Sequence, residues 1–287
     1  MLIVVTRPFI HTFGVFVTRR PFDQVSLSIG VPNLPVRLLG FLPGLTTPGG
    51  VTHQAVDDVA LMRSIPNMRI LEVGDATEVE SVLDVANSID GPVYIRMLRG
   101  DVPRLFPQHS QMKFGVARVL SNNHSCLSRD SDVAIITSGI CTEEALKARS
   151  MIQSSDVTVL HVHLSTLIPF PTDVILSACN MTKFGIITME NHSIVGGVGS
   201  AVAEVLAEHA VSKPLIRLGV PNGTYCHGAS REYLMRENGF DASALIRAIE
   251  KLTHQPLTQN WLEGTGNGSH SCARNDRAGK TERPEDL

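Results

Sequence analysis

The chain has 287 residues, 43% of them apolar, which is enough to fill the cores of two ordinary domains. The formal net charge of −3 provides no broad basic field, so we expect no binding to nucleic acid. The five cysteines are far apart and form no Cys-x-x-Cys pair, which argues against a zinc site or a disulfide framework. The apolar run at residues 1–5 is too short for a signal peptide, and no run approaches a membrane span. We therefore expect a reduced, cytoplasmic protein without membrane contact.

The first third of the chain alternates short apolar runs with helical patterns. Strands are predicted over residues 36–39, 70–73 and 93–98, with a helix over residues 53–65 between the first two. Asp75 is a predicted helix N-cap, with the carboxylate of Glu78 three residues later. Such alternation is typical of a parallel α/β sheet.

A second α/β region follows a polar stretch. Periodicity fades after about residue 105, and buried strands alternating with helical segments return over residues 132–137, 157–164, 185–189 and 215–220. We therefore expect a partial first domain at 1–105, a linker at 106–130, a second domain at 131–255 and a disordered tail at 256–287. The tail is predicted from its glycines, mixed charge and scarcity of apolar residues.

Four side chains are candidates for a site. Phe13 and Phe16 are three residues apart in a chain with only 5% aromatic content, and spacing alone favours a helix that enters a core. His53 lies where a turn-rich loop meets a predicted helix, a position at which a lone histidine is usually an ordinary cap or surface residue. Arg99 follows a buried strand, at the end where open α/β sheets place ligands, although a structural ion pair explains it equally well.

Two neighbouring features argue less for ligand binding. Arg96 lies on the opposite face of its strand from Arg99, because the two differ by an odd number of residues. The glycine-rich residues 196–199 follow a strand and open a helix, but they lack the full Gly-x-Gly-x-x-Gly pattern and a later strand-end acid. We interpret these glycines as allowing the helix and strand to approach closely.

Over residues 8–252 the chain resembles the C-terminal half of a transketolase, as encoded by split, two-gene transketolases. The resemblance rests on residues 12–16, 50–54, 94–100 and 189–199 in combination. It implies thiamine diphosphate as the cofactor, with Phe13 and Phe16 lining the pocket of the aminopyrimidine ring. It places His53 at the cofactor's reactive carbon as a catalytic residue and Arg99 at the phosphate of a sugar phosphate.

The resemblance also implies a partner. The diphosphate-binding domain is absent from this sequence, so an N-terminal transketolase subunit is expected to bind Mg²⁺ and to share the cofactor. The family's metal motif is Gly-Asp-Gly, whereas here Gly74 and Asp75 precede Ala76, so we expect no metal ligand in this chain. Self-association through both domains is implied as well.

Three departures separate the chain from the family pattern. The catalytic glutamate lies some twenty residues before the aromatic segment, whereas only eleven residues precede Thr12 and none is acidic, so the chain is expected to begin inside its first domain. Gly49 replaces an aspartate that reads the donor sugar, and Phe41 matches a histidine that helps to hold substrate phosphate. An altered sugar preference is therefore expected.

We interpret the chain as half of an enzyme that transfers a two-carbon ketol unit between sugars and that is inert without its partner. Two alternatives belong to other classes: an interaction subunit that has lost its chemistry, and the β subunit of a thiamine-dependent 2-oxoacid dehydrogenase. The aromatic segment and Arg99 favour the sugar enzyme over the dehydrogenase. The sequence does not identify the sugars, the partner gene or the stoichiometry.

Overall fold

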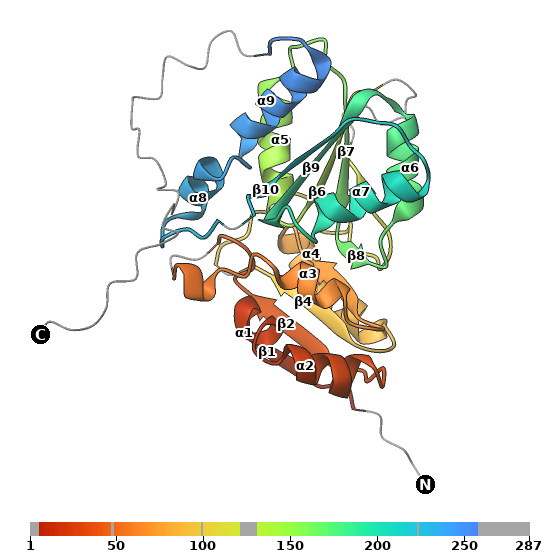
Figure 1. Cartoon of the computed structure of the whole chain (residues 1–287), viewed down its shortest axis with the longest axis vertical. Helices are drawn as coiled ribbons and strands as arrows, with labels where there is room; N and C mark the ends of the chain where they lie inside the picture. Colours follow the sequence, from red (N-terminus) through yellow and green to blue (C-terminus); the bar gives the residue numbers. More distant parts are fainter. Residues whose placement is uncertain (1–5, 47–48, 99, 121–130, 223, 258–287) are drawn as a thin grey trace, which may run out of the picture. The chain divides into compact units, whose positions relative to one another are not determined.

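A computed structural model describes residues 6–46, 49–98, 100–120, 131–222 and 224–257. Residues 6–257 belong to one compact unit, and two five-stranded sheets form its framework (Figure 1). The tail predicted over residues 256–287 lies outside the described residues beyond Leu257, as do residues 121–130 of the predicted linker.

The first sheet is parallel except at one edge. In spatial order its strands are β1 (Phe9–Phe13), β2 (Arg37–Phe41), β4 (Val93–Met97), β3 (Arg69–Glu72) and β8 (Thr166–Ile168), the last of which is antiparallel. The short helical segments of this half are α1 (Gly14–Thr18), α2 (Phe22–Val25), the π-helix η1 (Ser26–Gly30), the 3₁₀ helix η2 (Val51–His53), α3 (Asp58–Arg63) and α4 (Ala76–Ser88).

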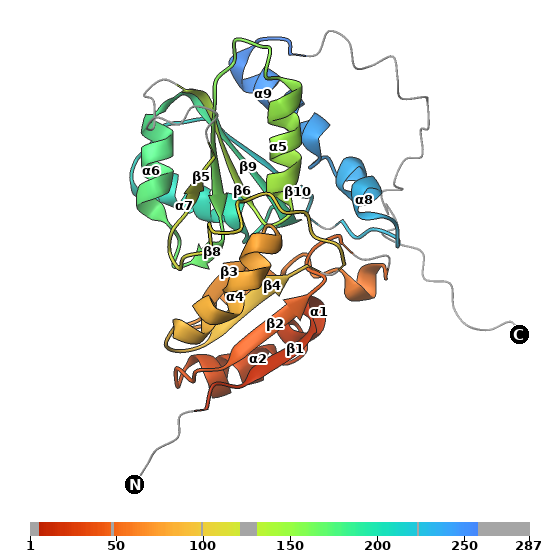
Figure 2. The same ribbon diagram turned by 180° about the vertical axis from the view of Figure 1, so that it is seen from behind.

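The second sheet has the same character. Its strands, in spatial order, are β10 (Leu215–Val220), β9 (Thr182–Ser193), β6 (Ser131–Ser138), β7 (Val159–Leu164) and the antiparallel β5 (Arg118–Val119). Its helices are α5 (Cys141–Met151), α6 (Thr172–Asn180), α7 (Val198–Glu208), α8 (Arg231–Glu237) and α9 (Ala242–Thr253). Helices α5 and α9 cover one face of this sheet and α6 and α7 cover the other, as Figure 2 shows from behind. The prediction of two consecutive, mostly parallel α/β sheets is confirmed.

Alternation along the strands divides the core of the first sheet between two faces. Leu71 and Ile95 pack under α4, whereas Ile70 and Tyr94 lie in the cluster that contains α1 and α3 residues. That second cluster continues through Ile136 and other residues of the second sheet. The two sheets therefore share part of one apolar core, and strand β8 links them further because it follows β7 in sequence but pairs with β3.

The cap at Asp75 forms as the sequence predicts. Its Oδ1 accepts the Glu78 N–H at 2.8 Å, and its Oδ2 accepts the N–H groups of Leu105 and Phe106. Both carboxylate oxygens of Asp75 thus bind main-chain donors and fix the start of α4.

One predicted helix is shorter than expected. Residues 53–65 were predicted as one helix, but the helical turns are η2 and α3, with extended chain between them. The interruption has a tertiary cause, because Ala55 forms a parallel bridge with Pro43 and the side chain of Gln54 binds the second half of the chain. Local periodicity contains no information about either contact.

Candidate functional site

Three aromatic rings from two separate segments meet at one end of the first sheet. Phe13 ends β1, Phe16 lies in α1 and His53 ends η2. Their ring centroids are 5.7 Å apart for the two phenylalanines, 5.4 Å for Phe13 and His53, and 5.3 Å for Phe16 and His53. All three side chains are half-buried, so the cluster has an exposed aromatic surface. A flat heterocycle stacks well against such a surface.

Strand register explains why these rings lie at this edge. Phe13 pairs with Phe41, and Phe41 pairs with Met97, so the carboxyl ends of three parallel strands are level. Ligands of open α/β sheets bind beyond this end of the strands. Arg99, the predicted phosphate ligand, is two residues past Met97 and lies outside the described residues.

Phe41, which the sequence comparison with the family marked as a departure, stands within this edge. Its ring meets the imidazole of His11 edge-on at 6.2 Å between centroids. An aromatic ring here supplies apolar contact and no charged donor for a phosphate.

The segment that carries His53 folds back on itself. The Gly44 N–H donates to the Ala55 carbonyl at 2.8 Å, which brings the two ends of the segment together. Within the segment, Thr52 Oγ1 and His53 Nδ1 are 2.8 Å apart. A hydrogen bond at Nδ1 leaves Nε2 as the nitrogen available to a ligand.

Two arginines that follow α1 adjoin the cluster. The guanidinium of Arg20 lies 4.5 Å from the ring centroid of Phe16, and Arg20 is exposed, so it adds positive charge beside the aromatic surface. Arg19 points inward instead, because its Nε donates to Asp57 at 2.9 Å and its Nη2 donates to the Gln54 carbonyl at 3.2 Å. The sequence places both residues near the aromatic segment but assigns neither a role.

Arg96 is buried and fully engaged with protein groups. It donates to both oxygens of Asp58, to Glu72 and to the Asn191 carbonyl. Burial alone would raise the pKa of the Asp58 carboxyl, but the charge of Arg96 lowers it below its usual value. Every nitrogen of the Arg96 guanidinium is thus bound to a group of the protein.

The glycine-rich turn before α7 is occupied by a carboxylate of the same chain. Glu190 accepts the N–H groups of Val198 at 2.6 Å and Gly199 at 2.8 Å. Burial raises the pKa of Glu190 to about 7, even though these two bonds lower it. A Cβ on Gly199 would lie 2.8 Å from Thr188 Oγ1, which confirms that this glycine allows close approach of helix and strand.

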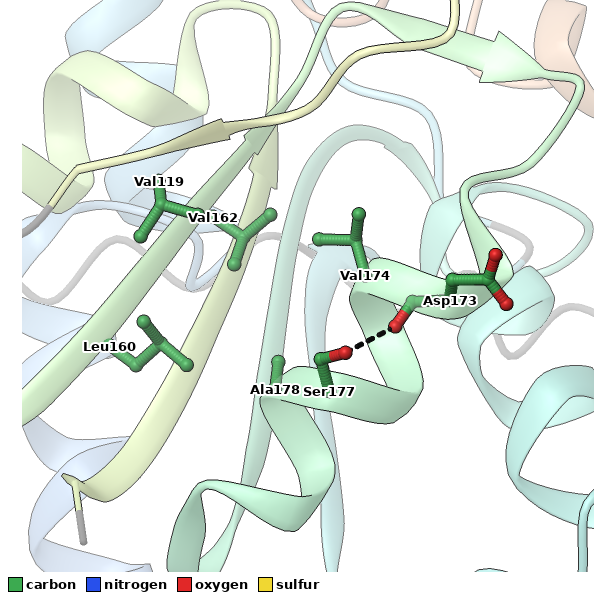
Figure 3. Close-up of a pocket in the computed structure, with 7 residues that line it drawn as sticks. All are labelled: Val119, Leu160, Val162, Asp173, Val174, Ser177 and Ala178. Carbon is green, nitrogen blue, oxygen red and sulfur yellow. Dashed lines mark hydrogen bonds between the residues drawn. The ribbon is translucent and has the colours of Figure 1, made fainter. Parts of the chain in front are cut away.

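A separate cavity lies in the second sheet. It has a volume of about 180 Å³, and Figure 3 shows it between strands β5 and β7 and helix α6. Its wall is mostly apolar, since five of the seven lining residues are Val, Leu or Ala, and the Ser177 hydroxyl donates to the Asp173 carbonyl at 2.7 Å. No residue of the aromatic cluster lines this cavity; its lining residues are Val119, Leu160, Val162, Asp173, Val174, Ser177 and Ala178.

The described part of the chain contains neither a helix suited to span a membrane nor a cluster of metal ligands. Among residues 6–257, with the gaps given above, no helix has the length and apolarity to cross a membrane. Within the same residues no three His, Cys, Asp or Glu side chains are grouped as metal ligands.

Comparison with known proteins assigns the family. Residues 3–104 match the transketolase pyrimidine-binding domain, and residues 125–245 match the transketolase C-terminal domain. The 6-deoxy-6-sulfo-D-fructose transketolase subunit of Clostridium sp. is 36% identical over 253 residues, which cover 86% of this chain and 74% of that protein. A solved split-gene transketolase, described as an inactive β4 tetramer, has a TM-score of 0.74 and is 33% identical. The match covers 86% of this chain and 76% of that protein. The chain therefore belongs to the transketolase family.

Another relative is a putative uncharacterized transketolase family protein of Sinorhizobium fredii. It is 34% identical over 225 residues, which cover 78% of this chain and 63% of that protein. The chain thus spans less than two thirds of this relative's length.

Proposed function

We propose that this chain is the C-terminal subunit of a split, thiamine diphosphate-dependent transketolase. In this proposal it works with an N-terminal subunit that holds the diphosphate and Mg²⁺, and the complex transfers a two-carbon ketol unit between sugars. The observation that carries the proposal is the cluster of Phe13, Phe16 and His53. The three ring centroids lie within 5.7 Å of one another at the carboxyl ends of the strands, in the part of the chain that matches the pyrimidine-binding domain. The inactive β4 assembly of the solved relative supports the need for a partner.

The residues present fit one part of the cofactor. Phe16 and Phe13 offer half-buried aromatic faces to an aminopyrimidine ring, and Arg20 adds positive charge beside them. When bound, thiamine diphosphate supplies the carbanion that breaks and forms carbon–carbon bonds of the sugars. The roles of this chain are to hold the ring, to orient the ketose and to move protons through His53 Nε2 at the sugar's carbonyl or hydroxyl. Arg99 is proposed to bind the phosphate of the sugar.

A second candidate is an interaction subunit without chemistry. It is favoured by Phe41 and Gly49, which stand where the family resemblance expects two polar substrate contacts. A complex that forms normally but transfers no ketol unit would support this candidate.

The test is reconstitution. The purified chain is mixed with the N-terminal subunit from the same genome, thiamine diphosphate and Mg²⁺, and ketol transfer is followed with phosphorylated and non-phosphorylated ketoses. We expect transfer only when both subunits are present, and no micromolar cofactor binding by this chain alone in calorimetry. Micromolar affinity corresponds to about 8 kcal/mol, which half a site does not supply. Oxidative decarboxylation of a 2-oxoacid in place of ketol transfer would contradict the proposal.

A further inference from the structure

Two buried carboxamides join the halves of the chain in a reciprocal manner. Asn191, in β9, donates from Nδ2 to the Pro43 carbonyl at 3.0 Å and accepts the Leu45 N–H at 2.9 Å. Gln54 donates from Nε2 to the Cys226 carbonyl at 2.8 Å and accepts the Cys226 N–H at 3.1 Å. Each amide side chain therefore pairs with main chain in the opposite half, as one peptide group pairs with another in a sheet.

These two pairs lie at the two ends of the segment that carries His53. Pro43 and Leu45 are at its start and Gln54 at its end, and the Gly44–Ala55 hydrogen bond closes the segment between them. Asn191 approaches so closely that a Cβ on Gly44 would collide with it.

Both carboxamides are buried, so water does not replace their hydrogen-bond partners. Gln54 is 0% exposed and Asn191 is 1% exposed. A buried carboxamide that turned away from its partners would leave polar groups without hydrogen bonds, so neither side chain is free to turn. The segment is therefore held at both ends by the second half of the chain.

A third contact ties the same segment to the aromatic helix. Arg19, directly after α1, donates to the Gln54 carbonyl and forms an ion pair with Asp57 at 2.9 Å. The guanidinium also lies 5.8 Å from the ring centroid of Tyr225, which precedes Cys226. The segments that carry Phe16 and His53 are thus also linked through Arg19.

We propose that the second domain anchors the His53 segment, with Gln54 and Asn191 as positioning residues that fix the imidazole against Phe13 and Phe16. A catalytic group held within about 0.5 Å of its working position must be supported by neighbours that are themselves locked. The catalytic consequence rests on the function proposed above. The anchoring itself is a property of this chain and is measurable without a partner.

The experiment compares Gln54→Met and Asn191→Leu, which retain approximate side-chain size but remove the hydrogen bonds, with Ser165→Ala. Ser165 is a matched control because it is buried and its hydroxyl also bonds across the two halves, to Glu78 at 2.8 Å, away from the His53 segment.

The first readout is the NMR signal of the His53 imidazole in the chain alone, assigned with His53→Ala. We expect Gln54→Met and Asn191→Leu to shift or broaden this signal and Ser165→Ala to leave it unchanged. If Gln54→Met fails to fold, Asn191→Leu decides in its place. An unchanged His53 signal in the anchor variants would overturn the proposal, as would an equal change in Ser165→Ala.

The second readout is turnover of the reconstituted complex. Gln54→Met is expected to lower kcat at least tenfold while KM changes less than threefold, and to cause no further loss in a His53→Ala background. Additive losses in the double variant would show that Gln54 does not act through His53. If His53→Ala itself leaves ketol transfer intact, the proposed function fails at His53, while the NMR comparison still decides whether the segment is anchored.

Discussion

Arg96 and Asp58 form an ion pair that water does not reach. Arg96 Nε lies 2.8 Å from Asp58 Oδ2, and the two side chains are 1% and 0% exposed. Tyr94 donates a further hydrogen bond to the same carboxylate at 2.6 Å. Because Asp58 opens α3, this network fastens the helix that follows the His53 segment onto strand β4.

Loss of this arginine is expected to be costly. Arg96→Met leaves the carboxylates of Asp58 and Glu72 buried without a cation, which we expect to lower the free energy of unfolding by about 3–5 kcal/mol. Urea denaturation of the chain measures this quantity. Arg7→Met is the control, since its partner Asp90 is exposed and the pair is worth little. A loss in Arg96→Met no larger than in Arg7→Met would refute the prediction.

Glu78 makes the stability of the chain depend on pH. Burial by itself would raise the pKa of this carboxyl, but the charge of His163 and hydrogen bonds from His163, Gly74 and Ser165 lower it to about 2 from an ordinary 4.5. The unfolded chain therefore takes up the proton first as acid is added. Stabilisation by Glu78 is complete above about pH 4.5 and is lost as the pH falls toward 2.

Substitution of Glu78 tests this sign. Glu78→Gln is expected to destabilise the chain at pH 7 by on the order of 3 kcal/mol, and its deficit relative to wild type is expected to shrink as the pH falls from 5 to 3. Denaturation curves at pH 7, 5 and 3 measure the difference. A deficit that stays constant across this range would contradict the assignment.

Gly44 is expected to tolerate no side chain. Its φ of +63° is unfavourable for other residues, and a Cβ would collide with Asn191. We expect Gly44→Ala to cost ~2 kcal/mol or more and to loosen the Asn191 bonds. Gly239→Ala is a matched control, because its φ is +70° but nothing lies within 4 Å of its Cβ position, so it should lose only about 1 kcal/mol from backbone strain. Equal losses would mean that the contact with Asn191 does not contribute to stability.

Substitution of the two predicted substrate-binding residues, Arg99 and His53, is expected to have different effects. In the reconstituted complex, Arg99→Ala should weaken the binding of a phosphorylated ketose by roughly 1.5–3 kcal/mol, because the guanidinium acts by binding phosphate. The binding of a non-phosphorylated ketose should be weakened much less. His53→Ala should lower kcat for both, since an imidazole at the reacting carbon acts on the transition state. Arg104→Ala, which breaks an exposed pair with Glu80, serves as the neutral control. Equal effects of Arg99→Ala on both sugars would remove the phosphate assignment.

Much of the framework is readable from local pattern. The apolar runs over residues 70–73, 93–98 and 215–220 become β3, β4 and β10 within one or two residues. The runs of β3 and β4 are buried on both faces of the sheet, so their apolar character persists along the strand and marks it in the sequence. The run of β10 was predicted to be buried as well, but β10 is an edge strand and is only partly buried. The cap at Asp75 is equally local, because its donor is only three residues away.

The candidate site is only partly readable in this way. Spacing indicates that Phe13 and Phe16 are near one another, and the family resemblance adds His53 and Arg99. Neither indicates that His53 packs against both rings or that Gln54 reaches Cys226, because those contacts join residues 37 to 172 positions apart.

Strands and helices can be predicted from the sequence because they depend on neighbours within a few positions. Their alternation indicates parallel sheets, and four short segments in combination carry the transketolase resemblance. Tertiary structure alone decided that β8 joins the first sheet, that the helix expected over residues 53–65 is interrupted, and that Asn191 and Gln54 hold the His53 segment. The physical reason is that a buried polar group is stable only with a partner. For Asn191 and Gln54 those partners lie in the other half of the chain, and only folding brings them within 3 Å or so.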